Sequence, residues 1–281
     1  MIFEHEIPNG SRLYFGENAK KKRILENKIS SFLEKNNFEE IVTPNFSYSQ
    51  HQSIDNETQL IKISDENNNQ VALRADSTLD VARIITKRLG RTTNHKKWFY
   101  IQPIFTYPSN EYYQIGLEWL EYDNIVDIIN LSSEIFKILE IQPLVQITNI
   151  NIAQTVAKEL NLDIDIFKNT ELSKLFELKI QWLDKLLYAS SANDLEQILD
   201  ILPNSITTEV KKLIDISNGI KYDNITISPL YYTAMKYYED LYFKVIDGNY
   251  TIAKGGRYTS DGVSSMGFAF YTDNLLKILE N

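Results

Sequence analysis

Two polar residues and a glycine recur at every second position of one aromatic-rich segment. Gln114, Gly116 and Glu118 lie within residues 112–122, which we expect to form a β-strand. Side chains at this spacing point to the same face of a strand, so the glycine leaves space between the amide and the carboxylate. A pocket for an amino acid needs a carboxylate for the ammonium and neutral polar groups for the side chain. The face is a binding wall if it lines a cleft. Otherwise it is the polar outer face of a half-buried hairpin, which composition alone favours.

A second candidate acid is Asp76, within residues 73–78 (LRADST). Its carboxylate could pair with an ammonium, but the position also fits a plain N-terminal helix cap. The three histidines, His5, His51 and His95, are isolated from one another, and we expect them to be surface or structural residues. The chain has no cysteine, which excludes disulfides, thiolate zinc sites and cysteine nucleophiles. Nucleotide-binding glycine motifs and the hydrolase elbow are also missing, so we expect no cofactor and no metal.

The 281 residues are enough for one large domain with a sizeable core. The charge balance of 29 Lys and Arg against 38 Asp and Glu gives −9, which argues against general attraction to a nucleic-acid backbone. The N-terminus does not resemble a signal peptide, and no stretch approaches the length of a spanning helix. We therefore expect a cytoplasmic protein without a membrane partner.

The first half of the chain alternates amphipathic helices with strand-like runs. Pro44 confines the first strand to an edge or an interrupted position. Turn-forming residues at 64–69 and at 108–111 predict two hairpins. The expected elements are a helix over 18–36, a strand over 38–46, strands over 59–63 and 70–73, a helix over 78–89, strands over 98–107 and 112–122, a helix over 125–139 and a strand over 144–148.

The second half begins with residues 151–218, which contain no glycine and one proline and read as consecutive helices. Strand signals resume at residue 224 and continue through 231–238, 242–246 and 250–253. A glycine turn at Gly255 and Gly256 and a terminal helix over 272–279 follow. The pattern predicts an α+β fold, with a mostly antiparallel sheet flanked by helices and interrupted by a helical insertion.

Several segments together resemble the class II aminoacyl-tRNA synthetase core of histidyl-tRNA synthetases. They follow one another in the family's order and span nearly the whole chain. The resemblance implies one synthetase-like core domain over residues 1–281, with a helical insertion at about 151–222, and a dimer built on residues 18–46. The matching segments are 73–78 (LRADST), 98–105 (WFYIQPIF), 113–118 (YQIGLE), 231–233 (YYT), 254–258 (KGGRY) and 266–270 (MGFAF).

This chain differs from that family at three positions where the synthetases have an arginine. Thr106 follows Phe105 where the synthetases have the motif 2 arginine, and Asn274 stands in place of the motif 3 arginine. Ile227 replaces a further arginine, five residues before the tyrosine pair. Cations of this kind stabilise charge on a transferring adenylate, so we expect no adenylation. The anticodon-binding domain is also expected to be absent, and with it tRNA binding.

The amino-acid side of the pocket matches the family residue by residue. The resemblance implies that Asp76 binds the ammonium of histidine with Thr78 beside it, and that Gln114 and Glu118 line the histidine site. Tyr231 and Tyr232 match the tyrosine pair, with Tyr232 over the imidazole. A synthetase core that keeps amino-acid recognition but loses ATP chemistry is similar to the regulatory subunit of ATP phosphoribosyltransferase. In that family, a homodimer within a hetero-oligomer joins the short catalytic subunit and carries histidine feedback in the first step of histidine biosynthesis.

Two other functions stay open on the sequence alone. One is a divergent amino-acid-activating enzyme that uses different cations, such as Arg74 or Arg257. The other is a synthetase-like binding module for another ligand or partner. Pyrophosphate exchange separates the enzyme from the other two, and co-purification with a phosphoribosyltransferase separates the regulatory subunit from the binding module.

Overall fold

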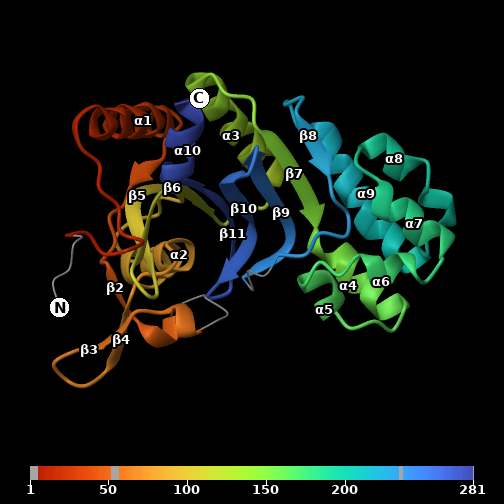
Figure 1. Cartoon of the computed structure of the whole chain (residues 1–281), viewed down its shortest axis with the longest axis horizontal. Helices are drawn as coiled ribbons and strands as arrows, with labels where there is room; N and C mark the ends of the chain where they lie inside the picture. The colour runs from red at the N-terminus through yellow and green to blue at the C-terminus, as the bar shows by residue number, and fades with distance from the viewer. Residues whose placement is uncertain (1–5, 52–56, 234–236, 281) are drawn as a thin grey trace. The chain divides into compact units, whose positions relative to one another are not determined.

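A computed structural model describes residues 6–51, 57–233 and 237–280 of the chain (Figure 1). His5 lies outside these residues. The chain divides into two compact units, one made of Met1–Tyr122 with Thr259–Asn281 and the other of Asp123–Tyr258. Among the helices in the described part of the chain, none combines the length and the apolar character that a bilayer-spanning segment needs.

The first unit is built on four neighbouring strands in the order β1-β5-β6-β11. The long hairpin of β5 (Lys97–Thr106) and β6 (Asn110–Leu120) confirms the hairpin expected over residues 98–122. On one side it pairs in parallel with β1 (Glu39–Glu40) and on the other antiparallel with β11 (Val263–Tyr271). Residues 263–271, for which the sequence pattern predicts no element, therefore complete the sheet.

Helices α1 (Gly16–Lys35) and α10 (Thr272–Leu279) contact each other, and they pack on β5 and β6 (Figure 1). Both confirm helices expected from the period of their apolar residues. The side chains of α1 that face inward are Leu25, Ile29 and Leu33, which are 3% exposed or less. The shorter helix α2 (Thr78–Ile84) contacts β6 and continues as a π-helical turn over Ile85–Leu89.

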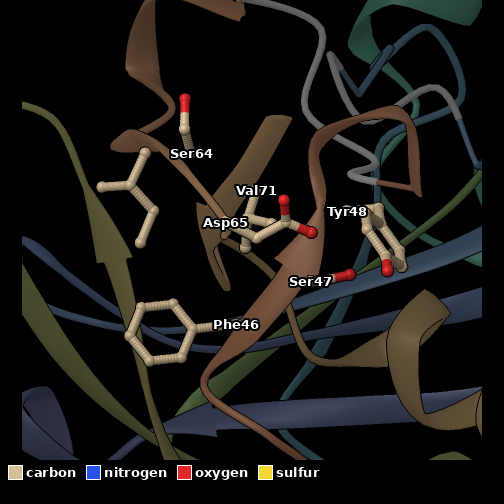
Figure 2. A pocket seen from close by; sticks show the side chains of 7 residues that line it. Phe46, Ser47, Tyr48, Ser64, Asp65 and Val71 are labelled. Carbon is tan, nitrogen blue, oxygen red and sulfur yellow. The ribbon is translucent and has the colours of Figure 1, made fainter. Parts of the chain in front are cut away.

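A separate three-stranded antiparallel sheet has the order β2-β4-β3. Its strands are β2 (Phe46–Tyr48), β3 (Lys62–Ser64) and β4 (Gln70–Leu73), and β3 with β4 confirms the first expected hairpin. Short 3-10 turns, η1 (Ser49–His51) and η2 (Glu57–Gln59), flank it. Phe46 and Tyr48 are about half exposed and, with Val71, line a groove of about 450 Å³ on this sheet (Figure 2).

The strand expected over residues 38–46 is interrupted around Pro44, which is one of the two placements that the sequence predicts, and β1 lies at the edge of its sheet. Only β1 and the first residue of β2 are extended ladder residues, and residues 41–45 belong to no strand. Pro44 has no N–H to offer a ladder. The carbonyls of Thr43 and Pro44 instead accept hydrogen bonds from Nη1 of Arg74, at 3.1 and 3.0 Å. A buried guanidinium has replaced the neighbouring strand as their partner.

The same guanidinium reaches two further elements. Nε and Nη2 of Arg74 donate to the carbonyl of Pro103 in β5, at 3.1 and 2.7 Å, and Nη2 donates to Oδ1 of Asn45 at 3.0 Å. The Arg74 backbone N–H donates to the Asn45 carbonyl, and its carbonyl accepts from the N–H of Phe105. Arg74 is fully buried, so the segment after β4 is held firmly between residues 43–45 and the end of β5.

The second unit contains the strand order β10-β9-β7-β8. Its strands are β7 (Leu144–Asn149), β8 (Ile225–Ile227), β9 (Tyr238–Asp247) and β10 (Tyr250–Ser260). β7 pairs in parallel with β8, whereas β7 with β9 and β9 with β10 are antiparallel. Helix α3 (Ile125–Leu139) has the predicted bounds. The mostly antiparallel α+β architecture expected from the sequence is confirmed.

Between β7 and β8 the chain is helical, as the composition of residues 151–218 predicts. Helices α4 and α9 contact each other, and α9 also contacts β7 and α3. The elements are α4 (Ile150–Glu159), α5 (Asp165–Lys168), α6 (Ser173–Phe176), α7 (Gln181–Tyr188), α8 (Ala192–Glu196), the turn η4 (Leu199–Ile201) and α9 (Asn204–Gly219).

Two expectations for the second unit are wrong. Residues 231–233 do not form a strand, and 234–236 lie outside the described residues. Gly255 and Gly256 are not a turn, because they pair with Phe243 and Tyr242 inside the β9–β10 ladder. A side-chain carbon at Gly256 would lie 2.4 Å from the carbonyl oxygen of Leu241. Close packing, rather than chain reversal, requires glycine there.

The Arg74 contacts predict a large loss of stability on substitution. Arg74→Met should lower the free energy of unfolding by about 3 kcal/mol or more, since each buried polar group left unpaired costs about 1–3 kcal/mol. Urea denaturation measures the change, with Arg23→Met as the control because the Arg23 side chain is 75% exposed. Equal stability of the two variants would show that Arg74 does not hold the fold.

Candidate functional site

One face of the sheet in the first unit is set by the register of three strands. The pairing of β5 with β6 and of β6 with β11 places three positions side by side in each row. Alternate residues along each strand share a face, so three successive rows lie on it. The rows are Trp98–Glu118–Gly267, Tyr100–Gly116–Ala269 and Gln102–Gln114–Tyr271.

Glu118 brings a fully buried carboxylate to the first row. The hydroxyl of Tyr100 donates to its Oε1 at 3.5 Å. Its other oxygen lies over Gly267, where an added side-chain carbon would come within 2.0 Å of Oε2. A carboxylate buried this deeply is stable only where polar partners surround it. The lack of a side chain at Gly267 is therefore what lets the acid lie flat on the sheet.

The space expected beside Gly116 is not open. The phenol ring of Tyr100 occupies it, because a side-chain carbon at Gly116 would lie 2.3 Å from the Tyr100 hydroxyl. The expectation that Gly116 leaves room for a ligand is therefore wrong in detail. The glycine admits the tyrosine that contacts Glu118.

The third row carries two buried amides. Gln102 and Gln114 are 3% and 2% exposed and lie directly opposite each other on β5 and β6. Oε1 of Gln102 accepts from the backbone N–H and the hydroxyl of Thr43, each at 3.2 Å. Within the described residues, Nε2 of Gln102 and Oε1 of Gln114 have no hydrogen-bond partner. With Glu118 also buried, the alternative of a solvent-exposed polar face is wrong.

Asp76 lies just before α2, where its buried carboxylate caps the first turn of the helix. Its Oδ1 accepts from the N–H of Thr78 at 3.0 Å, and the two side chains are 9% and 5% exposed. Burial and then the charge of Asp76 raise the pKa of the Tyr271 phenol above its ordinary value. Tyr271 pairs with Gln114 in the third row, and the helix that follows Asp76, α2, contacts β6. Four predicted site residues lie in the first unit, Gln114 and Glu118 on one sheet face and Asp76 and Thr78 at the start of α2, and their joint role in binding stays a prediction.

Tyr231 and Tyr232 belong to the second unit, in the segment between β8 and β9. Tyr231 stacks on Tyr242 with ring centroids 5.8 Å apart, and its carbonyl accepts from the Thr148 hydroxyl at 3.3 Å. Burial raises the pKa of Tyr231. Tyr232 is half-buried. The role of the pair in a common site with Asp76 stays a prediction.

Comparison with known proteins places the chain in a family. The family model for histidyl-tRNA synthetase matches residues 12–275. The ATP phosphoribosyltransferase regulatory subunit of Wolinella succinogenes is 42% identical over 282 residues, which cover 100% of this chain and 98% of that protein. The chain belongs to the family of ATP phosphoribosyltransferase regulatory subunits. A second member, from Helicobacter hepaticus, is 39% identical over 99% of both chains.

The fold of this regulatory-subunit family member is that of the class II synthetases. A solved structure from Bacillus halodurans, described as an ATP phosphoribosyltransferase regulatory subunit/histidyl-tRNA synthetase, superposes with a TM-score of 0.87 at 18% identity. It covers all of this chain and 84% of that chain. The histidine–tRNA ligase of Methanococcus aeolicus is 25% identical over 96% of this chain and 75% of the ligase. The expected fold class is confirmed.

The arginines that could replace the missing synthetase cations are held by the protein. The guanidinium of Arg74 is bound to backbone and side-chain oxygens, as described above. Nη1 of Arg257 lies 3.2 Å from Oδ2 of Asp240, and its Nη2 donates to the carbonyl of Asp123 at 2.8 Å. Ile227 is buried in β8, and Thr106 ends β5.

The histidines and acids form no metal centre in the described part of the chain, where no group of three or more potential ligands occurs. His51 and His95 pack edge-on against the rings of Tyr48 and Trp98. These contacts agree with the structural role that the sequence indicates for them.

Sequence reasoning missed part of the wall. Tyr100, Gln102, Gly267 and Tyr271 lie on the same face as the predicted residues. Aligning the expected hairpin around residues 108–111 would have paired Tyr100 with Gly116 and Gln102 with Gln114. Gly267 and Tyr271 needed the pairing of β11 with β6, which no local pattern signals.

Close packing at Gly267 predicts that even a methyl group there destabilises the protein. Gly267→Ala should lower the free energy of unfolding by about 1–3 kcal/mol or more, since the new methyl group would overpack Glu118 and the Leu117 carbonyl. The control is Ser265→Ala on the same strand, because within the described residues its buried hydroxyl has no partner. Thermal and urea denaturation report both changes. A Gly267→Ala protein as stable as Ser265→Ala would contradict this account of the wall.

Proposed function

We propose that this chain is a non-catalytic regulatory subunit that activates a short ATP phosphoribosyltransferase catalytic subunit and carries histidine feedback in the first step of histidine biosynthesis. The observation that carries the proposal is the 42% and 39% identity, over essentially full length, to two proteins named as regulatory subunits of this enzyme. The buried acidic wall supports the effector part of the proposal.

Histidine fits the wall by its charges. The ammonium would pair with Asp76, which the Thr78 N–H already holds in place. Glu118 lies two rows further along the same strand face, about 13 Å along the strand from the third row at the usual rise per residue. Its carboxylate can accept a hydrogen bond from an imidazole N–H, and Gln114 lies on the same face. The contact of Tyr232 with the imidazole, which the family resemblance implies, stays a prediction.

The absence of catalysis by the chain itself follows from charge. An adenylating site needs positive groups against the phosphates and the developing transition state. Thr106, Asn274 and Ile227 stand where the synthetases have cations. The two arginines that could substitute, Arg74 and Arg257, are bound to protein oxygens. No observation favours the alternative of an amino-acid-activating enzyme.

We also propose a cytoplasmic homodimer within a hetero-oligomer. Strand β1 lies at the edge of its sheet, and Val42 just after it is 77% exposed. Pairing of this edge with a second copy would cover both features. Neither tRNA nor a membrane is expected as a partner, because the net charge is −9.

The basic run of α1, residues 20–23, agrees with the expectation that the chain does not bind tRNA. Each cation lies close to a carboxylate, so the run does not form a free positive patch. The pairs are Lys20–Glu17, Lys21–Glu280, Lys22–Glu26 and Arg23–Glu26.

The experiment that tests the proposal measures phosphoribosyl transfer by the short catalytic subunit from the same genome, with and without this chain. Activation by the chain, and inhibition by histidine only in its presence, are expected. An unchanged rate would remove the regulatory role. Pyrophosphate exchange with histidine and ATP on the isolated chain should stay at background, and robust exchange would instead support an enzyme.

Asp76 provides the sharpest prediction of the binding mode. Removal of one charged partner from a desolvated pair costs about 2–5 kcal/mol, so Asp76→Ala should weaken histidine binding at least about thirtyfold. Asp76→Asn should weaken binding similarly while keeping an oxygen for the Thr78 N–H. Calorimetry on the complex measures both.

The matched control is Asp80→Asn on α2. Asp80 is also buried, but it binds Ser47 and Arg83, so its substitution should leave histidine affinity near the wild-type value. Equal histidine affinity of the wild type and Asp76→Asn would remove Asp76 from the site.

A further inference from the structure

We propose that Gln102 is a further recognition residue of the effector site, and that its Nε2 donates a hydrogen bond to the carboxylate of bound histidine. The inference rests on the proposed function, because it takes histidine as the ligand. It adds a contact on β5 that replaces the cationic partners missing from this chain.

The orientation of the Gln102 amide is fixed by a chain of hydrogen bonds. Nη1 of Arg74 donates to the hydroxyl oxygen of Thr43 at 2.9 Å. The hydroxyl proton of Thr43 is then directed to Oε1 of Gln102, at 3.2 Å. The backbone N–H of Thr43 donates to the same oxygen. Since an arginine and a backbone amide can only donate, the carbonyl side of Gln102 must face Thr43.

The Nε2 group of Gln102 is therefore turned away from Thr43. It is buried, since the Gln102 residue is only 3% exposed, and none of the described residues accepts a hydrogen bond from it. Gln114 lies directly opposite, and its Oε1 likewise finds no donor in the described part of the chain. Buried amide groups without partners are uncommon in native proteins. Nε2 of Gln102 can donate and Oε1 of Gln114 can accept a hydrogen bond, so the two neighbouring amides are suited to a polar ligand.

The position along the wall identifies the ligand group. Asp76, which would hold the ammonium, caps α2, the helix that contacts β6, and Gln102, Gln114 and Tyr271 form one row of the sheet that contains β6. The carboxylate of an α-amino acid is attached to the same carbon as its ammonium, so it lies in that row too. The proposed function assigns the imidazole to Glu118, whose charge would repel a ligand carboxylate. The donor nearest the ammonium therefore meets the carboxylate.

The test compares L-histidine with L-histidinol, in which a hydroxymethyl group replaces the carboxylate. Calorimetry on the full chain with the catalytic subunit gives the affinity ratio of the two ligands. Gln102→Met removes the donor and should lower histidine affinity at least about tenfold, while histidinol affinity changes little. Asp80→Asn is the control, because Asp80 is buried but binds Ser47 and Arg83, and it should leave the preference for histidine intact.

A second variant guards against misfolding. Gln102→Glu keeps an acceptor oxygen for the N–H and the hydroxyl of Thr43, and it sets a carboxylate against that of the ligand. Circular dichroism checks that the variant is folded. Gln102→Glu should abolish the preference for histidine over histidinol. A wild-type preference that persists in Gln102→Met or in Gln102→Glu would overturn the role of Gln102. A wild type that binds neither ligand would instead refute histidine as the effector, which is a failure of the proposed function.

Discussion

The buried guanidinium of Arg74 is the interaction on which the candidate site depends. It binds the carbonyls of Thr43, Pro44 and Pro103, and so joins two chain segments to the end of β5. Burial lowers its pKa, but the ordinary value of an arginine is so high that the group stays charged. Asp76 follows two residues later. Arg74 donates to the hydroxyl oxygen of Thr43, so this hydroxyl in turn donates to Oε1 of Gln102 and fixes the orientation of its amide. One cation thus positions an acid and orients an amide while touching neither ligand nor solvent.

The wall itself depends on small residues. Gly267 admits the Glu118 carboxylate and Gly116 admits the Tyr100 ring, so a buried acid lies beside its phenol donor with no backbone rearrangement. Because these side chains are already ordered, binding of an amino acid to this face would carry little entropy cost for ordering them. The proposed function separates two sets of residues: the acids and amides of this face for recognition, and the cations of the synthetases for adenylation.

The sequence predicts elements whose stabilising pattern is local. The α1 and α3 helices and both hairpins follow from apolar period and turn residues, and the parity of Gln114 and Glu118 places them correctly on one face. Pro44 signals the interruption of the first strand, but the partner of residues 43–45 is not visible in the sequence, because it is the side chain of Arg74 about thirty positions away along the chain. Gly255 and Gly256 defeat the prediction because both pair with β9 inside the ladder, and at Gly256 the close approach of the Leu241 carbonyl, not a turn, requires glycine. The role of Gln102 was not visible, since it depends on strand register and on a partner in another segment.

The central claim is that this chain keeps an amino-acid site built on two acids, and a crystal structure with L-histidine bound tests it most directly. The account predicts the ammonium within hydrogen-bond distance of the Asp76 carboxylate and the imidazole facing Glu118. Histidine bound elsewhere on the chain, with Asp76 and Glu118 facing no ligand atom, would contradict it.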